Sequence, residues 1–362
     1  MKMNSLKYDV LILGNGFDLH LHLKSSFASF FESTILSDNG YFKSNECNLL
    51  FYLLYLRFFN KSPRKSTMFR TIFNDDPSWM DVEGFIKEIA TNKSIMDGII
   101  RAMDYRNPNV IGPVNLDPYV SLLGDFLNKL NLPKDNYNQQ TFKNLLADNL
   151  TDFENRFASY LKEQINNSED YWNKQKAFVE TILSKASEYV RSESIMPLTQ
   201  IINFNYTNNP LNFCYEANVH GTIDSKIVIG YDSTSNTISD NDVFELSKDW
   251  RKIDIEFDFH HIKSEIDSII VYGHSLGEQD YPYFFELFDQ CDFLNRKYEV
   301  KLLVCYSKWE DTKKCEKQFD ILKMNAAKLL NSYERYKTKD LTRNTIVTSL
   351  KSNGRLVFIE ID

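Results

Sequence analysis

Residues 8–18 read YDVLILGNGFD, in which the segment Tyr8–Leu13 contains the apolar run Val10–Leu13 and is followed by Gly14-Asn15-Gly16. A short, continuous apolar run is typical of a strand that is buried on both faces. The spaced apolar residues that follow predict a helix from Phe17 to about Ser33. Glycine at the junction lets the backbone turn and approach another group without a Cβ in the way. This stretch therefore predicts the first strand–turn–helix unit of an α/β sheet.

The same alternation returns in the last part of the chain. The segments predicted as strands are Thr199–Phe204, Ala217–His220, Ile227–Ile229, Ser268–Tyr272, Val300–Cys305 and Leu356–Ile361, with helices near Glu278–Phe288 and Asp311–Asn331. Strands that alternate with helices form parallel sheets with both faces covered. We therefore predict an α/β fold with a Rossmann-like, mostly parallel sheet.

The intervening segment is predominantly helical. Helical spacing occurs over Asn48–Phe59, Val82–Thr91, Tyr119–Leu130, Phe142–Asn166 and Tyr171–Val190, with proline-containing breakers between several of them. Residues 1–34 and 195–362 are therefore expected to form one α/β domain. Residues 35–194 are expected to form a large helical insertion domain.

Composition narrows the classes of protein to consider. The chain is 43% hydrophobic, enough for a full core, and its net charge of −8 argues against nucleic acid as a partner. The five cysteines are an odd number without a C-x-x-C pair, which supports neither a disulfide framework nor a zinc knuckle. We see no secretory signal and no apolar run of the ~18 residues that span a bilayer. These features predict a cytoplasmic protein with no membrane partner.

Residues suited to chemistry follow four of the predicted strands. They are Gly14, Asn15, Gly16 and Asp18; Asn205; His220 and Gly221; and Gly273, His274, Ser275 and Asp280. The carboxyl ends of parallel strands meet at one edge of a sheet, where open α/β folds bind ligands. The Asn205 amide could bond both donor and acceptor groups of a sugar, and the His220 imidazole could act as a general base. These residues are therefore expected to surround one site.

Each of these signals has a structural alternative. Gly14-Asn15-Gly16 matches the opening of a dinucleotide fingerprint, but the third glycine is missing, and Asp18 places negative charge where a phosphate would dock. Asn15 could simply cap the first helix, and Asn205 a helix starting near Asn208. His220 could be hydrogen-bonded in a turn.

Two hydrolase alternatives use the same residues. Gly273–Gly277 matches the nucleophile elbow G-x-S-x-G, with Ser275 as nucleophile. However, His274 is the last histidine, so no base follows Ser275, and the serine could instead be a helix N-cap. A metal could use His220, His274, Asp18 and Asp280, but these lack a short ligand spacing, and no metal is expected.

Five motifs carry a family resemblance. They are Leu11–Leu19 (LILGNGFDL), Trp79–Glu83 (WMDVE), Asn203–Thr207 (NFNYT), Val219–Gly221 (VHG) and Gly273–Asp280 (GHSLGEQD). Together they resemble the bacteriophage abortive-infection AbiH family. AbiH-like proteins in turn resemble the sirtuin-like NAD-consuming domains of antiphage systems. Phe204 and Thr207 stand where those domains have Thr and Asp, and the four-cysteine zinc module of deacetylating sirtuins is absent.

The resemblance implies an antiphage effector with a sirtuin-like pocket that binds NAD as substrate and hydrolyses it to nicotinamide and ADP-ribose without a metal. It implies catalytic roles for Asn205 and His220. The residues implied to bind the nucleotide are Gly14, Asn15, Gly16, Asp18, Gly221, Gly273, His274, Ser275 and Asp280.

The resemblance implies that the activity is controlled, and the residues leave alternatives to it open. A constitutive NAD hydrolase would kill its host, so a phage-encoded trigger, a partner defence protein or assembly into a homo-oligomer is expected to control the activity. The alternatives are a non-catalytic nucleotide-sensing or interaction module, and a serine or metal-dependent hydrolase.

Trp79, Asp81 and Glu83 either reach the site from the insertion or merely start a helix, with Asp81 as its cap and Trp79 packed beside it.

Overall fold

The computed structural model describes residues 8–59, 80–92, 139–190, 199–208, 215–232, 243–253, 265–295, 299–308, 312–340 and 345–361, with the single positions 97, 123, 126, 127, 130, 262 and 342. The chain divides into two compact units. The first comprises Met1–Lys24, Leu161–Ser225 and Glu256–Asp362, and the second comprises Ser25–Tyr160 and Lys226–Ile255. The domain boundaries suggested by the sequence, at 34/35 and 194/195, stay a prediction.

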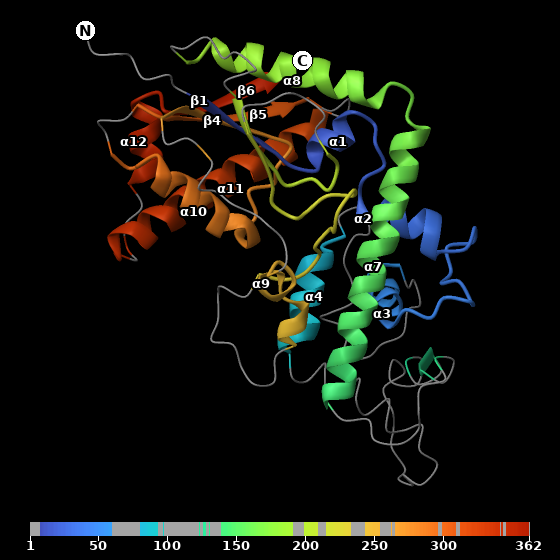
Figure 1. Ribbon diagram of the computed structural model, residues 1–362. Coiled ribbons are helices and arrows are strands. Elements are labelled where there is room, and N and C mark those ends of the chain that lie inside the picture. Colours follow the sequence, from blue (N-terminus) through green and yellow to red (C-terminus); the bar gives the residue numbers. More distant parts are fainter. Residues whose placement is uncertain are drawn as a thin grey trace. The chain divides into compact units, whose positions relative to one another are not determined.

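The first unit is built on a six-stranded sheet (Figure 1). Its strands are β1 (Tyr8–Leu13), β2 (Thr199–Asn203), β3 (Tyr215–Asn218), β4 (Ile266–Tyr272), β5 (Lys301–Ser307) and β6 (Leu356–Ile361). The order is β3-β2-β1-β4-β5-β6, and every neighbouring pair is parallel. This is the strand order of a Rossmann-like fold, so the predicted fold class is confirmed. The winding direction reverses between β1 and β4, the position at which such folds place their ligands.

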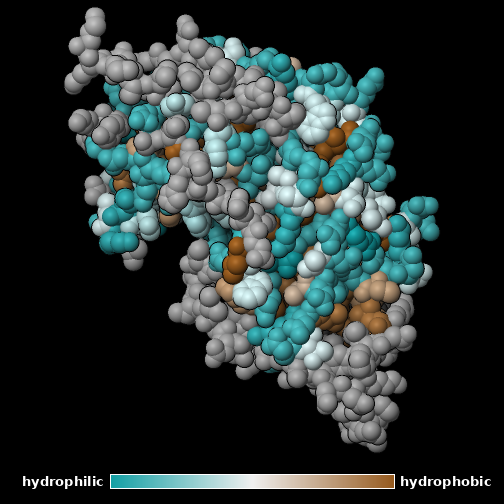
Figure 2. Space-filling view, in the orientation of Figure 1, coloured by the Kyte–Doolittle hydropathy of each residue, from teal (hydrophilic) through white to brown (hydrophobic). Residues whose placement is uncertain are grey.

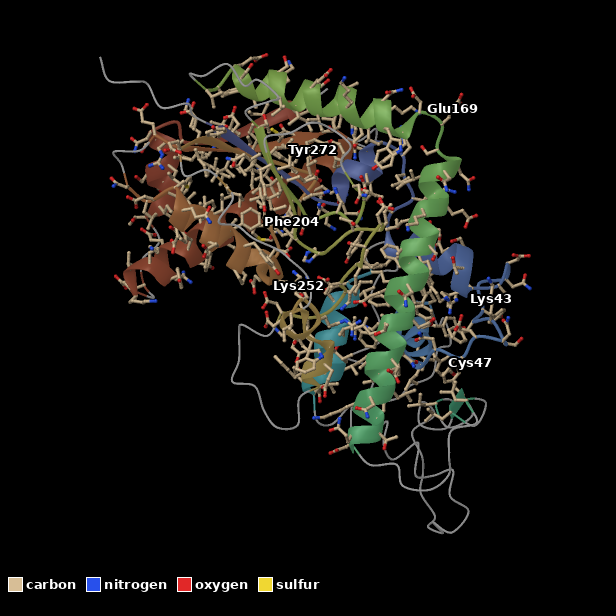
Figure 3. The ribbon with its side chains drawn as sticks, in the orientation of Figure 1. Lys43, Cys47, Glu169, Phe204, Lys252 and Tyr272 are labelled. Carbon is tan, nitrogen blue, oxygen red and sulfur yellow. The ribbon has the colours of Figure 1, made fainter. Side chains whose placement is uncertain are left out.

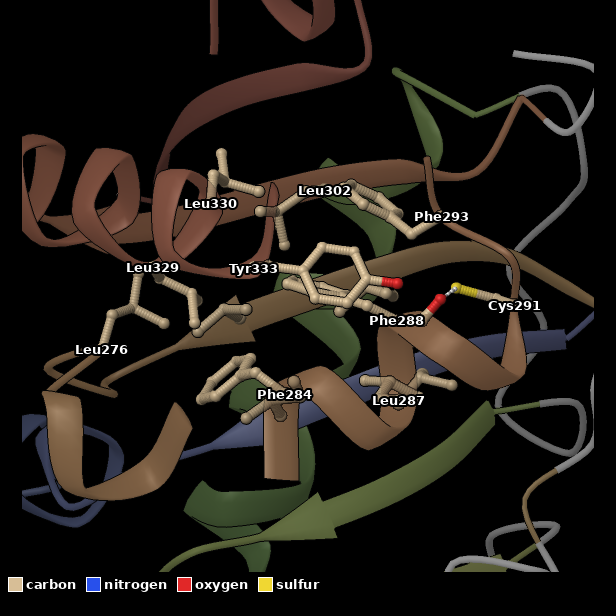
Figure 4. Packing of buried hydrophobic residues seen from close by; sticks show 14 of the residues in the cluster. Leu276, Phe284, Leu287, Phe288, Cys291, Phe293, Leu302, Leu329, Leu330 and Tyr333 are labelled. Atoms are coloured by element: carbon tan, nitrogen blue, oxygen red, sulfur yellow. Dashed lines mark hydrogen bonds between the residues drawn. The ribbon is translucent and has the colours of Figure 1, made fainter. Parts of the chain in front are cut away.

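Three helices cover one face of this sheet: α10 (Tyr281–Gln290), α11 (Thr312–Thr338) and α12 (Ile346–Ser352). Alternate strand residues, such as Val10 with Ile12 and Leu302 with Val304, enter one core with them. Figure 4 shows Phe284 and Phe288 of α10 packing with Leu329 and Tyr333 of α11 beneath the strands. Burial of this apolar surface, about 25 cal/mol per Å², is the main stabilisation of the unit.

The other face carries α1 (Gly16–His20) and α8 (Tyr171–Ser187). Phe178 of α8 joins them to the sheet, with its ring 5.8 Å from Phe17 and 5.0 Å from Tyr272. The helix predicted over Phe17–Ser33 is wrong, because α1 ends at His20. His22 is left-handed (φ 62°), its N–H donates to Leu19 O, and Leu23 N–H donates to Asp18 O. This is a Schellman cap with a histidine where glycine is usual.

The second unit is mainly helical. It contains α2 (Phe27–Phe30), a π-helical turn (Phe31–Ile35), α3 (Leu49–Phe58), α4 (Val82–Thr91), α9 (Lys248–Arg251) and the first part of α7 (Gln139–Asn167). Its core is a cluster of aromatic rings, with Phe51 and Phe153 5.0 Å apart and Phe30 stacked on Phe153 at 5.7 Å. These rings dominate the apolar area that the unit buries.

The segment around Asp81 has a local structural explanation. Asp81 Oδ1 accepts the Gly84 N–H at 2.8 Å, so the predicted cap of α4 is confirmed. Glu83 pairs with the buried Lys248 at 2.7 Å, within the same unit. Trp79 lies outside the described residues.

Two predicted strands differ in the structure. Ile227–Ile229 is buried but is no strand, because Ile229 N–H donates to Glu154 Oε1 at 2.8 Å rather than to a neighbouring strand. The same carboxylate accepts Arg251 Nε at 2.9 Å, and burial raises the pKa of Glu154. The strand predicted at Ala217–His220 lies two residues earlier, at Tyr215–Asn218, so His220 falls in the following turn.

One face of the described residues is largely polar. Figure 2 shows one face that is mainly hydrophilic, with hydrophobic side chains in small separate areas. Among the helices that the structure describes, none is both long and apolar enough to cross a membrane. Most of the helix predicted at Tyr119–Leu130, and the polar segment 233–242, lie outside the described residues.

Candidate functional site

The loops after β1 and β4 pack directly on each other. Gly14 N–H donates to Tyr272 O at 3.0 Å, and Gly16 N–H donates to Gly273 O at 2.8 Å. A Cβ at Gly14 would lie 2.5 Å from His274 Cα, and one at Gly273 would lie 2.3 Å from Phe17 N. Glycine is therefore required here for loop–loop packing, and this packing fixes the position of His274. That these glycines also line a nucleotide pocket stays a prediction.

Asn15 does not have the capping role considered for it. It stands at the N-cap position of α1, but its side chain makes no cap hydrogen bond. Its predicted contact with the nucleotide stays untested. The helix itself has only five residues, too few to make its N-terminus an anion site without further groups.

Asp18 lies in a buried network that joins three segments. Its Oδ1 accepts the Tyr171 hydroxyl of α8 at 2.7 Å, and its Oδ2 accepts the Thr207 hydroxyl, after β2, at 2.9 Å. The residue is 1% exposed, and this burial raises the pKa of its carboxyl group to about 6, although both hydroxyls oppose the shift. Asp18 thus fastens the turn after β2 to α1 and α8.

The raised pKa of Asp18 predicts a specific pH dependence. Its pKa in the folded state, about 6, exceeds the ordinary value of 3.8. Its contribution to stability is therefore fully present below about pH 4 and is lost as the pH rises through 6. Replacing Asp18 by asparagine should remove this loss, because the amide oxygen can still accept the Tyr171 hydroxyl. Urea titrations should show the stability difference, Asp18→Asn minus wild type, growing by roughly 2–3 kcal/mol between pH 4 and pH 7. A difference that does not change with pH would contradict the buried, titrating carboxyl group.

The turn after β2 is organised by Asn203. Its Nδ2 donates to Thr207 O at 2.9 Å and to Asn218 Oδ1, at the end of β3, at 3.1 Å. Its Oδ1 accepts the Asn205 N–H at 3.0 Å. Asn203 therefore holds the neighbouring Asn205 in place and ties it to β3.

The Asn205 side chain contrasts with that of Asn203. Asn205 is only 3% exposed, and within the described part of the chain its Oδ1 accepts no hydrogen bond. A buried amide oxygen without a donor costs about 1–3 kcal/mol. Such an atom suits a ligand that supplies the donor. The alternative role, as N-cap of a helix near residue 208, concerns positions 209–214 outside the described residues.

His220, His274 and Asp280 meet beside this turn. Asp280 Oδ1 lies 3.6 Å from His220 Nε2, and Asp280 Oδ2 lies 3.3 Å from His274 Nε2. The Phe204 ring, labelled in Figure 3, contacts both imidazoles edge-on, with centroid distances of 5.6 Å to His220 and 4.4 Å to His274. Both histidines are buried. One carboxylate thus bridges two imidazoles, each through a different oxygen.

The arrangement of Ser275 does not favour a serine nucleophile. Ser275 is exposed, and its Oγ makes no hydrogen bond to a histidine in the described part of the chain. It is not a helix N-cap either, because the 3₁₀ turn Glu278–Asp280 begins later, with Gly277 at its N-cap position. A general base for this serine is therefore missing among the described residues.

The four residues considered as metal ligands do not all lie together. His220, His274 and Asp280 come together, whereas Asp18 is engaged with Tyr171 and Thr207. Among the residues that the structure describes, no three His, Cys, Asp or Glu side chains are placed to hold a metal ion.

Sequence reasoning named most of the residues that gather here but missed three that arrange them. Gly221, with φ 71°, completes the turn that carries His220. The missed residues are Asn203, Phe204 as a contact of both imidazoles, and Tyr171. A signal existed only for Asn203, a polar residue inside an otherwise apolar strand end. The site's ligand and catalytic roles stay predictions.

Comparison with known proteins identifies the family. The family model described as bacteriophage abortive infection AbiH matches residues 10–301. No curated protein and no solved structure shows significant similarity to the chain. The matched region includes most of β1, all of β2, β3 and β4, and every residue of the candidate site described above. It covers well over half of the sequence, and on this basis the chain belongs to the bacteriophage abortive infection AbiH family.

Proposed function

We propose that this AbiH protein acts in abortive infection by binding NAD at the carboxyl edge of its sheet and hydrolysing it to nicotinamide and ADP-ribose. The observation that carries the proposal is the buried Asn205 Oδ1, which accepts no hydrogen bond from any residue that the structure describes. It lies one residue from Phe204 and Tyr206, whose rings both contact His220. An acceptor in the turn after β2 and an imidazole in the turn after β3 are thus joined by ring contacts at the same edge of a Rossmann-like sheet.

The residues present fit a nucleotide ribose. A ribose hydroxyl that donates to Asn205 Oδ1 would remove the cost of the unsatisfied oxygen, while the Asn205 NH₂ group can donate to a ribose oxygen. The glycines of the two packed loops and the neighbouring Asp280 belong to the same edge. Gly14, Asn15, Gly16, Asp18, Gly221, Gly273, His274, Ser275 and Asp280 are the residues proposed to shape the nucleotide site.

The proposed reaction needs little acid catalysis. The bond between ribose C1′ and the pyridinium nitrogen breaks, and its electron pair neutralises the leaving nicotinamide. As this bond breaks, the ribose passes through an oxocarbenium-like state. Water forms the new C1′–O bond and gives one proton to His220. Asn205 would hold the ribose hydroxyls while His220 activates the water. No metal is required by this scheme.

The proposal also covers the protein's location in the cell and the control of its activity. NAD hydrolysis would deplete a cytoplasmic pool, so a cytoplasmic location belongs to it. Control by a phage-encoded trigger, by a partner defence protein or by assembly into a homo-oligomer is also part of the proposal, since unrestrained hydrolysis would kill the host.

The direct test is to incubate the purified full-length protein with NAD and measure nicotinamide release, with and without lysate from phage-infected cells. We expect release in at least the second condition. NAD binding without release would instead support a nucleotide-sensing module. Ester hydrolysis that is lost in Ser275→Ala would support a serine hydrolase. Absence of both NAD binding and release in both conditions would overturn the proposal.

A further inference from the structure

We infer that Asp280 and His274 are positioning residues that fix the tautomer of His220, with the proton on Nε2 and the basic lone pair on Nδ1. The tautomer follows from the geometry of the three side chains. Its use, with Nδ1 as the atom that takes the proton from water, rests on the proposed function.

Asp280 stands at the start of a helix, yet its carboxylate faces two histidines instead of capping the helix. It is the N-cap residue of α10, where an aspartate ordinarily accepts a backbone N–H from the first helical turn, a bond worth about 1 kcal/mol. Here the side chain makes no cap hydrogen bond. Its two oxygens instead lie 3.6 Å and 3.3 Å from the two imidazoles. The start of α10 still favours its negative charge through the helix dipole.

His274 has a tautomer that can be assigned from its neighbours. Its Nδ1 accepts the Leu276 N–H at 2.9 Å, so Nδ1 carries no proton. In a neutral imidazole the proton must then lie on Nε2, which faces Asp280 Oδ2. Leu276 adopts φ 55°, a left-handed conformation that is unfavourable for leucine, while its side chain is buried in the core. The loop thus holds His274 with its Nε2 facing Asp280 Oδ2.

His220 is oriented by the other oxygen of the same carboxylate. An unprotonated Nε2 would direct its lone pair at Asp280 Oδ1, 3.6 Å away, and would be repelled. A proton on Nε2 is attracted instead, which leaves Nδ1 as the acceptor. When Nδ1 takes up a proton, the imidazolium is stabilised by the adjacent carboxylate. The Phe204 ring beside both imidazoles strengthens this attraction by excluding water.

The tautomer can be measured without any substrate. Full-length protein labelled with ¹⁵N-histidine should show, at a pH where its imidazoles are neutral, the Nε2–H pattern of long-range ¹H–¹⁵N couplings for His220 and His274. His220→Gln and His274→Gln assign the two signals. In Asp280→Asn the His220 signal should change to a mixture of tautomers. An Nδ1–H pattern for His220 in the wild type would overturn the inference.

A matched control is available on the same helix. Asp289 of α10 accepts the Tyr333 hydroxyl at 2.6 Å and has no imidazole among its described hydrogen-bond and ion-pair partners. Asp289→Asn should leave the His220 signal unchanged. Equal changes in Asp280→Asn and Asp289→Asn would show a general effect on α10 and would contradict the positioning role.

Enzyme kinetics provide a second test, which is independent of the NMR measurement. If the protein turns over NAD, Asp280→Asn should lower kcat by about 10²–10⁴-fold with KM changed less than about threefold, and Asp280→Glu should recover part of kcat. The expected couplings without NAD turnover would retain the positioning role and remove the proposed function. NAD turnover together with an Nδ1–H tautomer of His220 would retain the proposed function and remove the positioning role.

Discussion

Replacing His220 by alanine is expected to lower NAD turnover by about 10²–10⁴-fold, the usual contribution of a general base. His220 lies in the turn after β3, where its Nε2 faces Asp280 and its ring contacts Phe204. No other imidazole in the described residues faces Asp280 Oδ1. The measurement is the initial rate of nicotinamide release at saturating NAD, together with the melting temperature of each variant.

Ser275→Ala separates this prediction from the hydrolase alternative. The Ser275 side chain is exposed, and no described histidine bonds to its Oγ, so its loss should leave the turnover number within about threefold of wild type. Complete inactivation by both substitutions, at unchanged melting temperatures, would favour Ser275 as a nucleophile. Inactivation by neither would remove His220 from the chemistry.

The centre of the sheet could be predicted from the sequence because the central strands are buried on both faces. The central strands β1 and β4 contain the continuous apolar runs Val10–Leu13 and Ile269–Tyr272, and a continuous run needs no knowledge of register. Since all strands are parallel, the residues after them had to share an edge, which is why His220, Asn205 and His274 were predicted near one another. The same reasoning could not tell which of them touch.

The predictions failed where hydrogen bonds rather than hydrophobicity decide the structure. Ile227–Ile229 has the apolar pattern of a strand, but the buried Glu154 takes the Ile229 N–H. The first helix ends at His20, and the left-handed residue that follows it is His22 rather than the usual glycine. Asp280 stands at the N-cap position of α10, but its carboxylate faces His274 and the more distant His220. The outcomes at Ile229 and Asp280 depend on partners far away in the chain.

Gly273→Ala is expected to destabilise the folded protein by about 3–5 kcal/mol in urea titrations. The left-handed φ of 70° costs an alanine about 1–2 kcal/mol. The new Cβ would also lie 2.3 Å from Phe17 N and 2.7 Å from Gly16 C, which are backbone atoms that cannot rotate away. Relieving this contact would separate the two loops and break the bond from Gly16 N–H to Gly273 O.

Gly354→Ala is the matched control for the backbone conformation. Gly354 has a similar φ of 65°, but a Cβ there would meet nothing within 4 Å, so only the conformational cost of about 1–2 kcal/mol should appear. The difference between the two variants measures the close approach of the loops after β1 and β4. If Gly273 were needed only to let NAD approach, the two variants would lose equal stability in the ligand-free protein. Only Gly273→Ala would then also lose NAD affinity. A larger loss in ligand-free Gly273→Ala would instead show that the packed glycines build the site before any ligand binds.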